Sequence, residues 1–326
     1  MAEAEAQAEM SENDERLLLV ASTGGHLTQL IELADRLPGA RSRTWVTFDS
    51  AQSRSSLAGE DVRYLPYVAP RGYLALAKCL RPASRILRET SPDRVVSTGA
   101  GIALAFLPAA RRHGATALYI ESATRAEGPS MTGKLLSRFR HVELATQHPG
   151  WVDDRWTYRG SVFDGFESVA GMPHELRRVV VTLGTMETYG FRRLVERLVR
   201  VLPAEAEVLW QTGVTDLTGL AVDGRAAVPA SELEEAIATA DLVIGHAGTG
   251  SALTALRLGK RPLLVPRRAA HGEHVDDHQL QTAAYLSGLG LATVVDASEL
   301  DEDTLFAATA ATVRRRSQPP PLRLDP

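Results

Sequence analysis

The chain has little of several features that would assign it to other classes of protein. Its 326 residues include one cysteine, Cys79, which excludes an internal disulfide framework and is typical of a reducing compartment. No run approaches the roughly 18–20 apolar residues that a membrane-spanning helix needs. The net charge of −4 provides no global positive field for nucleic acid. We therefore expect a soluble, cytoplasmic protein of about two domains, with no nucleic-acid partner.

Both ends of the chain are predicted to be disordered tails. Residues 1–15 contain six acidic residues and neither a basic residue nor an apolar core, so they do not resemble a signal peptide. Residues 317–326 include three consecutive prolines. Neither segment has the periodic apolar pattern that a packed element requires.

Apolar strands alternate with helical patterns between the tails, which predicts an α/β fold. Periodicity is lost within the segment 163–176, which we interpret as a linker between an N-terminal domain, 16–162, and a C-terminal domain, 177–316. A last helix is expected over 305–316. Each half begins with an apolar strand that enters a glycine turn, and each contains a second such turn further on. This pattern predicts two doubly wound, Rossmann-like domains that face a central cleft.

The glycine-rich turn at 245–251 is the strongest local signal. It follows the short apolar strand Leu242–Ile244 and precedes a helix that ends at Gly259, so it belongs to a parallel βαβ unit. Unpaired backbone N–H groups and the helix dipole at such a turn favour a phosphate, and no metal ion is needed. The alternative is a tight turn that binds nothing.

Several motifs together resemble a known family. The segment 243–266, which contains the turn, and Asp277-His-Gln279 downstream resemble the catalytic subunit of the dolichol-linked GlcNAc transferase that makes chitobiose. Earlier segments are similar to its acceptor-binding partner subunit: Ser22-Thr-Gly-Gly-His26, Ser97-Thr-Gly-Ala-Gly101, Ile120-Glu-Ser122 and Thr132-Gly-Lys-Leu-Leu136. The peptidoglycan GlcNAc transferase and bacterial exopolysaccharide transferases have the same two halves. The resemblance spans roughly residues 17–300.

The resemblance implies a GT-B fold and an inverting transfer from a nucleotide sugar, with neither a metal ion nor another cofactor. The donor is expected to be UDP-linked, and the acceptor is expected to be a hydroxyl of a polyprenyl-diphosphate-linked saccharide used for cell-surface polysaccharide. The implied donor-binding residues are Gly184, Thr185, His246, Ala247, Gly248, Thr249, Gly250, Ser251, Thr254, Asp277 and Gln279. The implied acceptor-binding residues are Thr23, Gly24, Gly25, Thr98, Gly99, Gly101 and Ser122. Thr254 stands where the family usually has a glutamate that contacts the nucleotide ribose.

Two residues are candidates for the base that takes the acceptor proton. His26 ends a glycine turn, and an unperturbed imidazole titrates near neutral pH, although it could instead cap its helix or contact acceptor phosphate. Glu121 ends a strand at the same edge, although it could instead pair with Arg125 or cap the next loop. The sequence leaves both open.

Other polar residues have two interpretations each. His246 could donate to the diphosphate or pack within its turn. Asp277 and Gln279 could read sugar hydroxyls, or Gln279 could complete a capping box with Asp276. Three histidines fall within eight residues and could indicate a metal site: His271, His274 and His278. The surrounding glycine and proline favour a sugar-binding loop instead.

The segment 71–88 carries five basic residues and no acidic one. It is interpreted either as a core-facing helix with a solvated basic face or as a contact with an anionic membrane surface. In the second interpretation the protein would be peripheral on the inner face of the membrane.

Two other enzyme activities fit the same fold. One is a soluble transferase that glycosylates a small natural product. The other is a nucleotide-sugar 2-epimerase, which would require acidic residues on both sides of the sugar.

Overall fold

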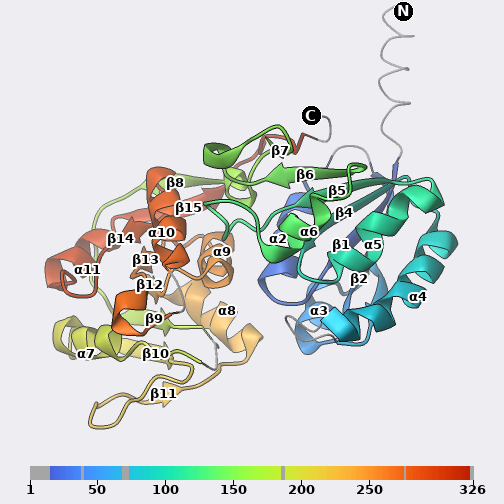
Figure 1. Cartoon of the computed structure of the whole chain (residues 1–326). Coiled ribbons are helices and arrows are strands. Elements are labelled where there is room, and N and C mark those ends of the chain that lie inside the picture. Colours follow the sequence, from blue (N-terminus) through green and yellow to red (C-terminus); the bar gives the residue numbers. More distant parts are fainter. Residues whose placement is uncertain (1–14, 38–39, 68–72, 185–187, 275–276, 324–326) are drawn as a thin grey trace, which may run out of the picture. The chain divides into compact units, whose positions relative to one another are not determined.

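A computed structural model describes residues 15–37, 40–67, 73–184, 188–274 and 277–323, with the backbone alone for 73–75 and 278. The chain divides into two compact units. Unit 1 contains Met1–Val162 and Pro320–Pro326, and unit 2 contains Phe163–Pro319. Each unit is an α/β structure built on a parallel sheet (Figure 1).

Unit 1 has a seven-stranded sheet in the order β3-β2-β1-β4-β5-β6-β7, and every neighbouring pair is parallel. The strands are β1 (Glu15–Ala21), β2 (Ala40–Phe48), β3 (Asp61–Leu65), β4 (Arg94–Gly99), β5 (Thr116–Ile120), β6 (Val142–Thr146) and β7 (Trp156–Tyr158). The helices are α2 (Gly25–Ala34), α3 (Ala51–Ser56), α4 (Tyr73–Thr90), α5 (Ala103–Ala110) and α6 (Met131–Leu136). The central strands β1 and β4 contain buried apolar runs, Leu17–Ala21 and Val95–Val96, because both faces of the sheet are covered.

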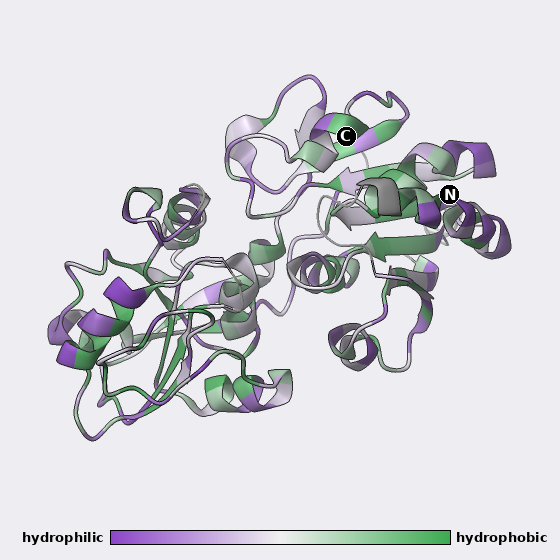
Figure 2. Ribbon diagram, turned by 60° about the horizontal axis from the view of Figure 1, so that its bottom comes forward, coloured by the Kyte–Doolittle hydropathy of each residue, from purple (hydrophilic) through white to green (hydrophobic). Residues whose placement is uncertain are grey.

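Unit 2 has a six-stranded sheet in the order β11-β10-β9-β12-β13-β14, also parallel. The strands are β9 (Arg178–Thr182), β10 (Glu207–Gln211), β11 (Gly224–Arg225), β12 (Leu242–Gly245), β13 (Leu263–Leu264) and β14 (Thr293–Val294). The helices are α7 (Arg192–Val201), α8 (Ala230–Thr239), α9 (Thr249–Arg257), α10 (His278–Gly288) and α11 (Glu302–Ala308). In Figure 2 the strands of both sheets are mostly hydrophobic, whereas many helices carry a hydrophilic face.

The expected helix over 305–316 is wrong. The helix α11 ends at Ala308, and Ala311–Arg315 forms strand β15. This strand pairs antiparallel with β8 (Phe166–Ala170), which lies inside the segment interpreted as a linker. A tertiary partner therefore overrides local helix propensity, and much of the expected linker is a structured part of unit 2.

The two expected tails are also shorter than the sequence indicated. Glu15 belongs to β1, and its carboxylate pairs with Arg94 at 2.9 Å. Leu322 is 1% exposed, and its N–H donates to the carbonyl of Arg36 at 3.0 Å. The residues around Leu322 therefore pack on unit 1, while 1–14 and 324–326 lie outside the described residues.

Candidate active site

Each unit has a topological switch point, where the chain crosses to opposite sides of one central strand. In unit 1 the switch lies between β1 and β4, and in unit 2 it lies between β9 and β12. Ligands of open parallel sheets bind at the carboxyl ends of such strand pairs. All four of the predicted glycine turns follow one of these strands, so two of them meet at each switch point.

His26 lies at the switch point of unit 1, in the first turn of α2. Its Nδ1 is 2.8 Å from the carbonyl oxygen of Thr98, and the Thr98 hydroxyl donates to the carbonyl of His26 at 2.8 Å. A carbonyl can only accept, so Nδ1 carries the proton. The neutral ring therefore keeps its lone pair on Nε2, which is the form that a general base requires.

The surroundings of His26 favour this neutral form. Burial lowers the pKa of the imidazole, while the Thr98 carbonyl and the negative charge of Glu121 oppose that shift. The net direction is below the usual value of 6.5. His26 is consequently deprotonated at neutral pH and able to accept a proton.

Gly99 is required beside His26 for two reasons. Its φ of 111° lies in a region that favours glycine. In addition, a Cβ at this position would lie 3.0 Å from the Tyr119 hydroxyl and 3.3 Å from Cε1 of His26. The β4 turn thus lets the imidazole lie directly against the backbone.

Glu121, the rival base, is buried and fully engaged. It is 1% exposed. One carboxylate oxygen accepts from the Tyr119 hydroxyl at 3.1 Å and from the Ser122 N–H at 3.0 Å, and the other accepts from the Ser130 N–H at 2.8 Å. Burial raises the pKa of Tyr119 well above its usual value, so its hydroxyl remains a donor. Glu121 therefore holds the loop after β5 in place.

The other predicted acceptor residues divide into open and buried positions. A Cβ at Gly24 or Gly25 would meet no atom within 4 Å, and Thr23 beside them is half-buried. Gly101 is also half-buried. Ser122, by contrast, is 5% exposed. The turn after β1 thus has open space around its two glycines.

Three glutamines that brace this site were missed from the sequence. Gln29 is 2% exposed and donates to the Ser122 hydroxyl at 3.1 Å. Gln147 donates to Gln29 at 3.0 Å, and Gln52 accepts from the Gly24 N–H at 2.6 Å. Gln29 was detectable as a polar residue beside the apolar positions of its helix, whereas Gln52 carries no such signal.

In unit 2, His246 lies between the turns after β9 and β12. A Cβ on Gly184 would be 2.9 Å from its Cε1, and a Cβ on Gly248 would be 2.4 Å from its Nε2. Its Nδ1 is 3.2 Å from the carbonyl of Thr182, so Nδ1 carries the proton. Donation from Nε2 to a diphosphate would therefore require the imidazolium form. Packing within the turn, the second interpretation, is what the contacts display.

The start of α9 lacks a side-chain cap and has open space at one of its glycines. The N-cap, Gly248, provides no side-chain cap. The hydroxyl of Thr249 is buried and has no hydrogen-bond partner among the described residues. A Cβ on Gly250 would meet nothing within 4 Å. Helix-terminal N–H groups with room above them form an anion site.

The remaining predicted donor-binding residues have no contact in the described structure that points to a ligand. Ser251 is half-buried, and Ala247 has a φ of 62° within the turn. The Thr254 hydroxyl donates to the carbonyl of Gly250 at 3.0 Å, so it is engaged within α9. Thr185 lies outside the described residues.

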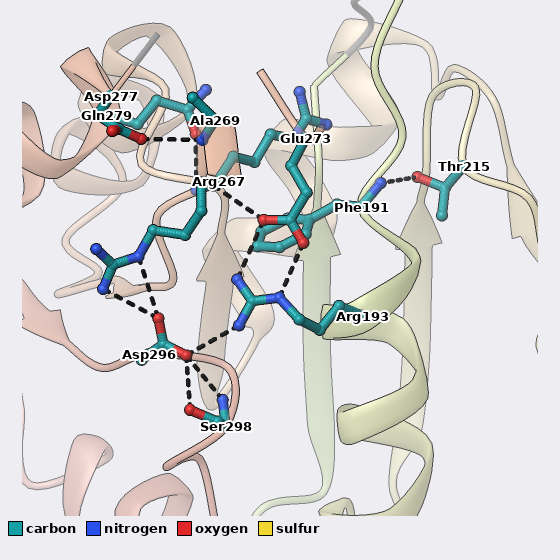
Figure 3. A network of polar contacts seen from close by, with 11 residues as sticks. Phe191, Arg193, Thr215, Arg267, Ala269, Glu273, Asp277, Gln279, Asp296 and Ser298 are labelled. Atoms are coloured by element: carbon teal, nitrogen blue, oxygen red, sulfur yellow. Dashed lines mark hydrogen bonds and ion pairs between the residues drawn. The ribbon is translucent and has the colours of Figure 1, made fainter. Parts of the chain in front are cut away.

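Asp277 and Gln279 brace the loop after β13. Asp277 accepts from the Ala269 N–H at 2.9 Å, and Gln279 accepts from the Arg267 N–H at 3.1 Å (Figure 3). The N-cap of α10 is Asp277, and Asp276 lies outside the described residues. In the described structure both side chains fix the loop itself, which is a role that neither sequence interpretation included.

A network of ion pairs fixes the same loop to α7. Arg193 binds Glu273 through two nitrogens, at 2.9 and 3.1 Å, and binds Asp296 at 2.9 Å (Figure 3). Arg268 also binds Asp296, at 3.1 and 3.2 Å. Burial opposes ionisation of Asp296, but hydrogen bonds from Ser298 and Arg193 outweigh it and lower its pKa far below the usual range. These contacts give the loop a fixed conformation.

The histidines of this loop do not form a cluster within the described residues. The ring of His274 stacks on Tyr189, with centroids 5.7 Å apart. His271 is exposed at the end of a short 3₁₀ helix, and the side chain of His278 is not described. Across the described parts of the chain, no three metal-ligating side chains converge.

The sequence and the fold are both similar to known transferases. Residues 178–321 match the glycosyltransferase family 28 C-terminal domain. Two curated relatives are named UDP-N-acetylglucosamine–N-acetylmuramyl-(pentapeptide) pyrophosphoryl-undecaprenol N-acetylglucosamine transferase. The one from Methylococcus capsulatus is 28% identical over 93% of this chain and 90% of its own length. The one from Xanthomonas oryzae pv. oryzae is 30% identical over 86% of this chain and 67% of its own length.

A solved structure is similar over the same span. MurG of Acinetobacter baumannii superposes with a TM-score of 0.53 and 19% identity, covering 90% of this chain and 89% of that one. The fold is therefore that of the GT-B glycosyltransferases. The chain belongs to the family of GT-B glycosyltransferases related to the peptidoglycan GlcNAc transferase, as the motifs predicted.

Within the part of the chain that the structure describes, no helix has the length and apolarity needed to cross a bilayer.

The packing of His246 makes a prediction about two neighbouring glycines. Gly248→Ala forces the imidazole to move and should lower the free energy of unfolding by about 1–3 kcal/mol. Gly250→Ala, which meets no neighbour, should be neutral or stabilise by up to about 1 kcal/mol. Urea unfolding measures both. In a His246→Ala background the cost of Gly248→Ala should disappear; equal losses in both backgrounds would contradict the packing explanation.

Proposed function

We propose that this enzyme transfers a sugar, with inversion, from a UDP-linked donor to a hydroxyl of a polyprenyl-diphosphate-linked saccharide. Two features at the switch points carry the proposal. In unit 1 the Thr98 carbonyl orients the imidazole of His26, and in unit 2 the N-terminus of α9 is open to an anion. The names of the curated relatives supply the donor and acceptor classes. The order of the two halves along the chain supports the same assignment.

In this mechanism Nε2 of His26 takes the proton of the acceptor hydroxyl. The hydroxyl oxygen forms a bond to the anomeric carbon as the bond from that carbon to the diphosphate oxygen breaks, so one displacement inverts the configuration. The amides at the start of α9 stabilise the charge of the departing diphosphate. A metal ion is not needed for this step.

The alternative activities have less support. A 2-epimerase would use acidic residues beside the sugar, but Glu121 is bonded to three donors and Asp277 to the Ala269 N–H. A natural-product transferase shares the fold, but the two curated relatives described above are named as N-acetylglucosamine transferases of a pyrophosphoryl-undecaprenol acceptor.

Two variants test the identity of the base. His26→Ala should lower kcat by roughly 10²–10⁴ and leave donor affinity nearly unchanged. In the wild type the rate should fall as pH drops through the pKa of His26, which lies below 6.5, and this acidic limb should be absent from His26→Ala. Measured rates against pH decide the point.

Glu121→Gln is the matched control for that assay. It should keep the acidic limb, and its main effect should be a lower melting temperature because the Ser130 N–H loses a charged acceptor. If Glu121→Gln shows the larger loss of kcat in folded protein, and His26→Ala mainly raises acceptor KM, then the roles are exchanged.

We further propose that α4 contacts the membrane that holds the acceptor. Its buried face, which includes Cys79, Ala83 and Leu87, packs in the core of unit 1, as the core-facing interpretation expected. Its other face exposes four basic side chains and a half-exposed leucine: Lys78, Arg81, Arg85, Arg88 and Leu80. Basic side chains near an anionic bilayer contribute about 1 kcal/mol each.

Charge reversal tests this contact. The double variant Arg81→Glu with Arg85→Glu should bind phosphatidylglycerol vesicles with an affinity at least about tenfold lower, as measured by co-sedimentation. Arg177→Glu with Arg200→Glu makes the same change in net charge on exposed positions of unit 2 and should have little effect. Equal losses in the two double variants would indicate a nonspecific charge effect and contradict the assignment to α4.

A further inference from the structure

In unit 2, a buried arginine near the turn after β9 has no carboxylate bonded to it among the described residues. Arg267 is 1% exposed and is the largest fully buried side chain in the described structure. Its Nη2 donates to the carbonyl of Leu183 at 2.8 Å. Its Nε and Nη1 are shielded from solvent and have no hydrogen-bond partner among the described residues.

The two described carboxylates of the adjoining ion-pair network are already bonded to other groups. Glu273 accepts from the Arg193 guanidinium and from the backbone N–H of Arg268. Asp296 accepts from the guanidinium groups of Arg193 and Arg268. Arg267 is therefore a third cation near Glu273, whose charge the Arg193 guanidinium already balances. Its guanidinium carbon lies 5.7 Å from the centroid of the Phe191 ring (Figure 3).

The charge of Arg267 persists at neutral pH. Burial lowers its pKa, and the negative charge of Glu273 opposes the shift. An arginine titrates so far above neutrality that it stays protonated. A buried, incompletely paired charge is unfavourable for folding unless another group compensates it.

The position of the Arg267 charge indicates which group compensates it. Leu183, which accepts from Arg267, directly precedes Gly184. Gly184 packs against His246, and His246 packs against Gly248 at the start of α9. The guanidinium therefore lies one peptide unit from the turn after β9, and the His246 ring packs between that turn and the start of α9.

We propose that Arg267 is an internal cation that stabilises the donor diphosphate through its electrostatic field, without touching the ligand. This inference rests on the proposed donor site. The charge adds to the helix-terminal amides where a nucleoside diphosphate binds and where negative charge remains on the leaving group. Arg267 is thus a specificity-determining residue for a diphosphate over an uncharged nucleoside.

Calorimetric titration of UDP and of uridine against matched variants tests the proposal. Arg267→Lys retains the charge, whereas Arg267→Gln retains a donor for the Leu183 carbonyl but is neutral. The ratio of UDP to uridine affinity should fall by about tenfold in Arg267→Gln and by much less in Arg267→Lys. Uridine affinity should be similar in all three proteins. Arg261 is a half-buried arginine bonded to Gly290, Ala292 and Thr293. Arg261→Gln is therefore the control and should leave the ratio of UDP to uridine affinity unchanged.

The outcomes separate the inference from the function on which it rests. An unchanged ratio in folded Arg267→Gln, or equal falls in Arg267→Gln and Arg267→Lys, would overturn the role of the charge while leaving the donor site intact. Wild-type protein that binds UDP no better than uridine would overturn the donor site and the inference together. If Arg267→Gln does not fold, Arg267→Met, with a similar length and no charge, takes its place in the same titrations.

Discussion

Parallel strands place all their carboxyl ends at one edge of a sheet, and both candidate sites depend on this constraint. Because β1 lies beside β4, and β9 beside β12, residues far apart in the sequence become neighbours. His26 reaches the Thr98 carbonyl for this reason, and His246 reaches Gly184. Neither contact needs an unusual local sequence beyond the small residues that allow close approach.

That constraint explains why the fold could be predicted from the sequence. A continuous apolar run followed by a glycine turn occurs at β1 and β12, and a shorter one at β4, and the pattern has few other structural explanations. The pattern fails where a strand is short or lies at an edge. The segment 305–316 has helical composition, but β8 supplies an antiparallel partner for Ala311–Arg315. Leu322 is buried by residues of unit 1 that no local pattern associates with it.

The candidate site could be predicted only in part. The glycines and the histidines are close to the strand ends, so their placement followed from topology. The bracing contacts were not predictable, because Arg193 and Glu273 are 80 residues apart and nothing in either segment indicates the other. The sequence likewise could not distinguish Glu121 from His26. Only the structure shows three donors around the carboxylate and a carbonyl that orients the imidazole.

The central claim is that a nucleoside diphosphate binds at the start of α9, and one measurement tests it most directly. A side chain on Gly250 would point into open space, so Gly250→Val should fold but occupy the volume of the diphosphate. Gly288→Val, at another helical glycine with no neighbour within 4 Å, is the matched control. Calorimetry should find that UDP binding is lost in Gly250→Val, by about 100-fold or more, and retained in Gly288→Val. A folded Gly250→Val protein that binds UDP as tightly as the wild type would contradict the account.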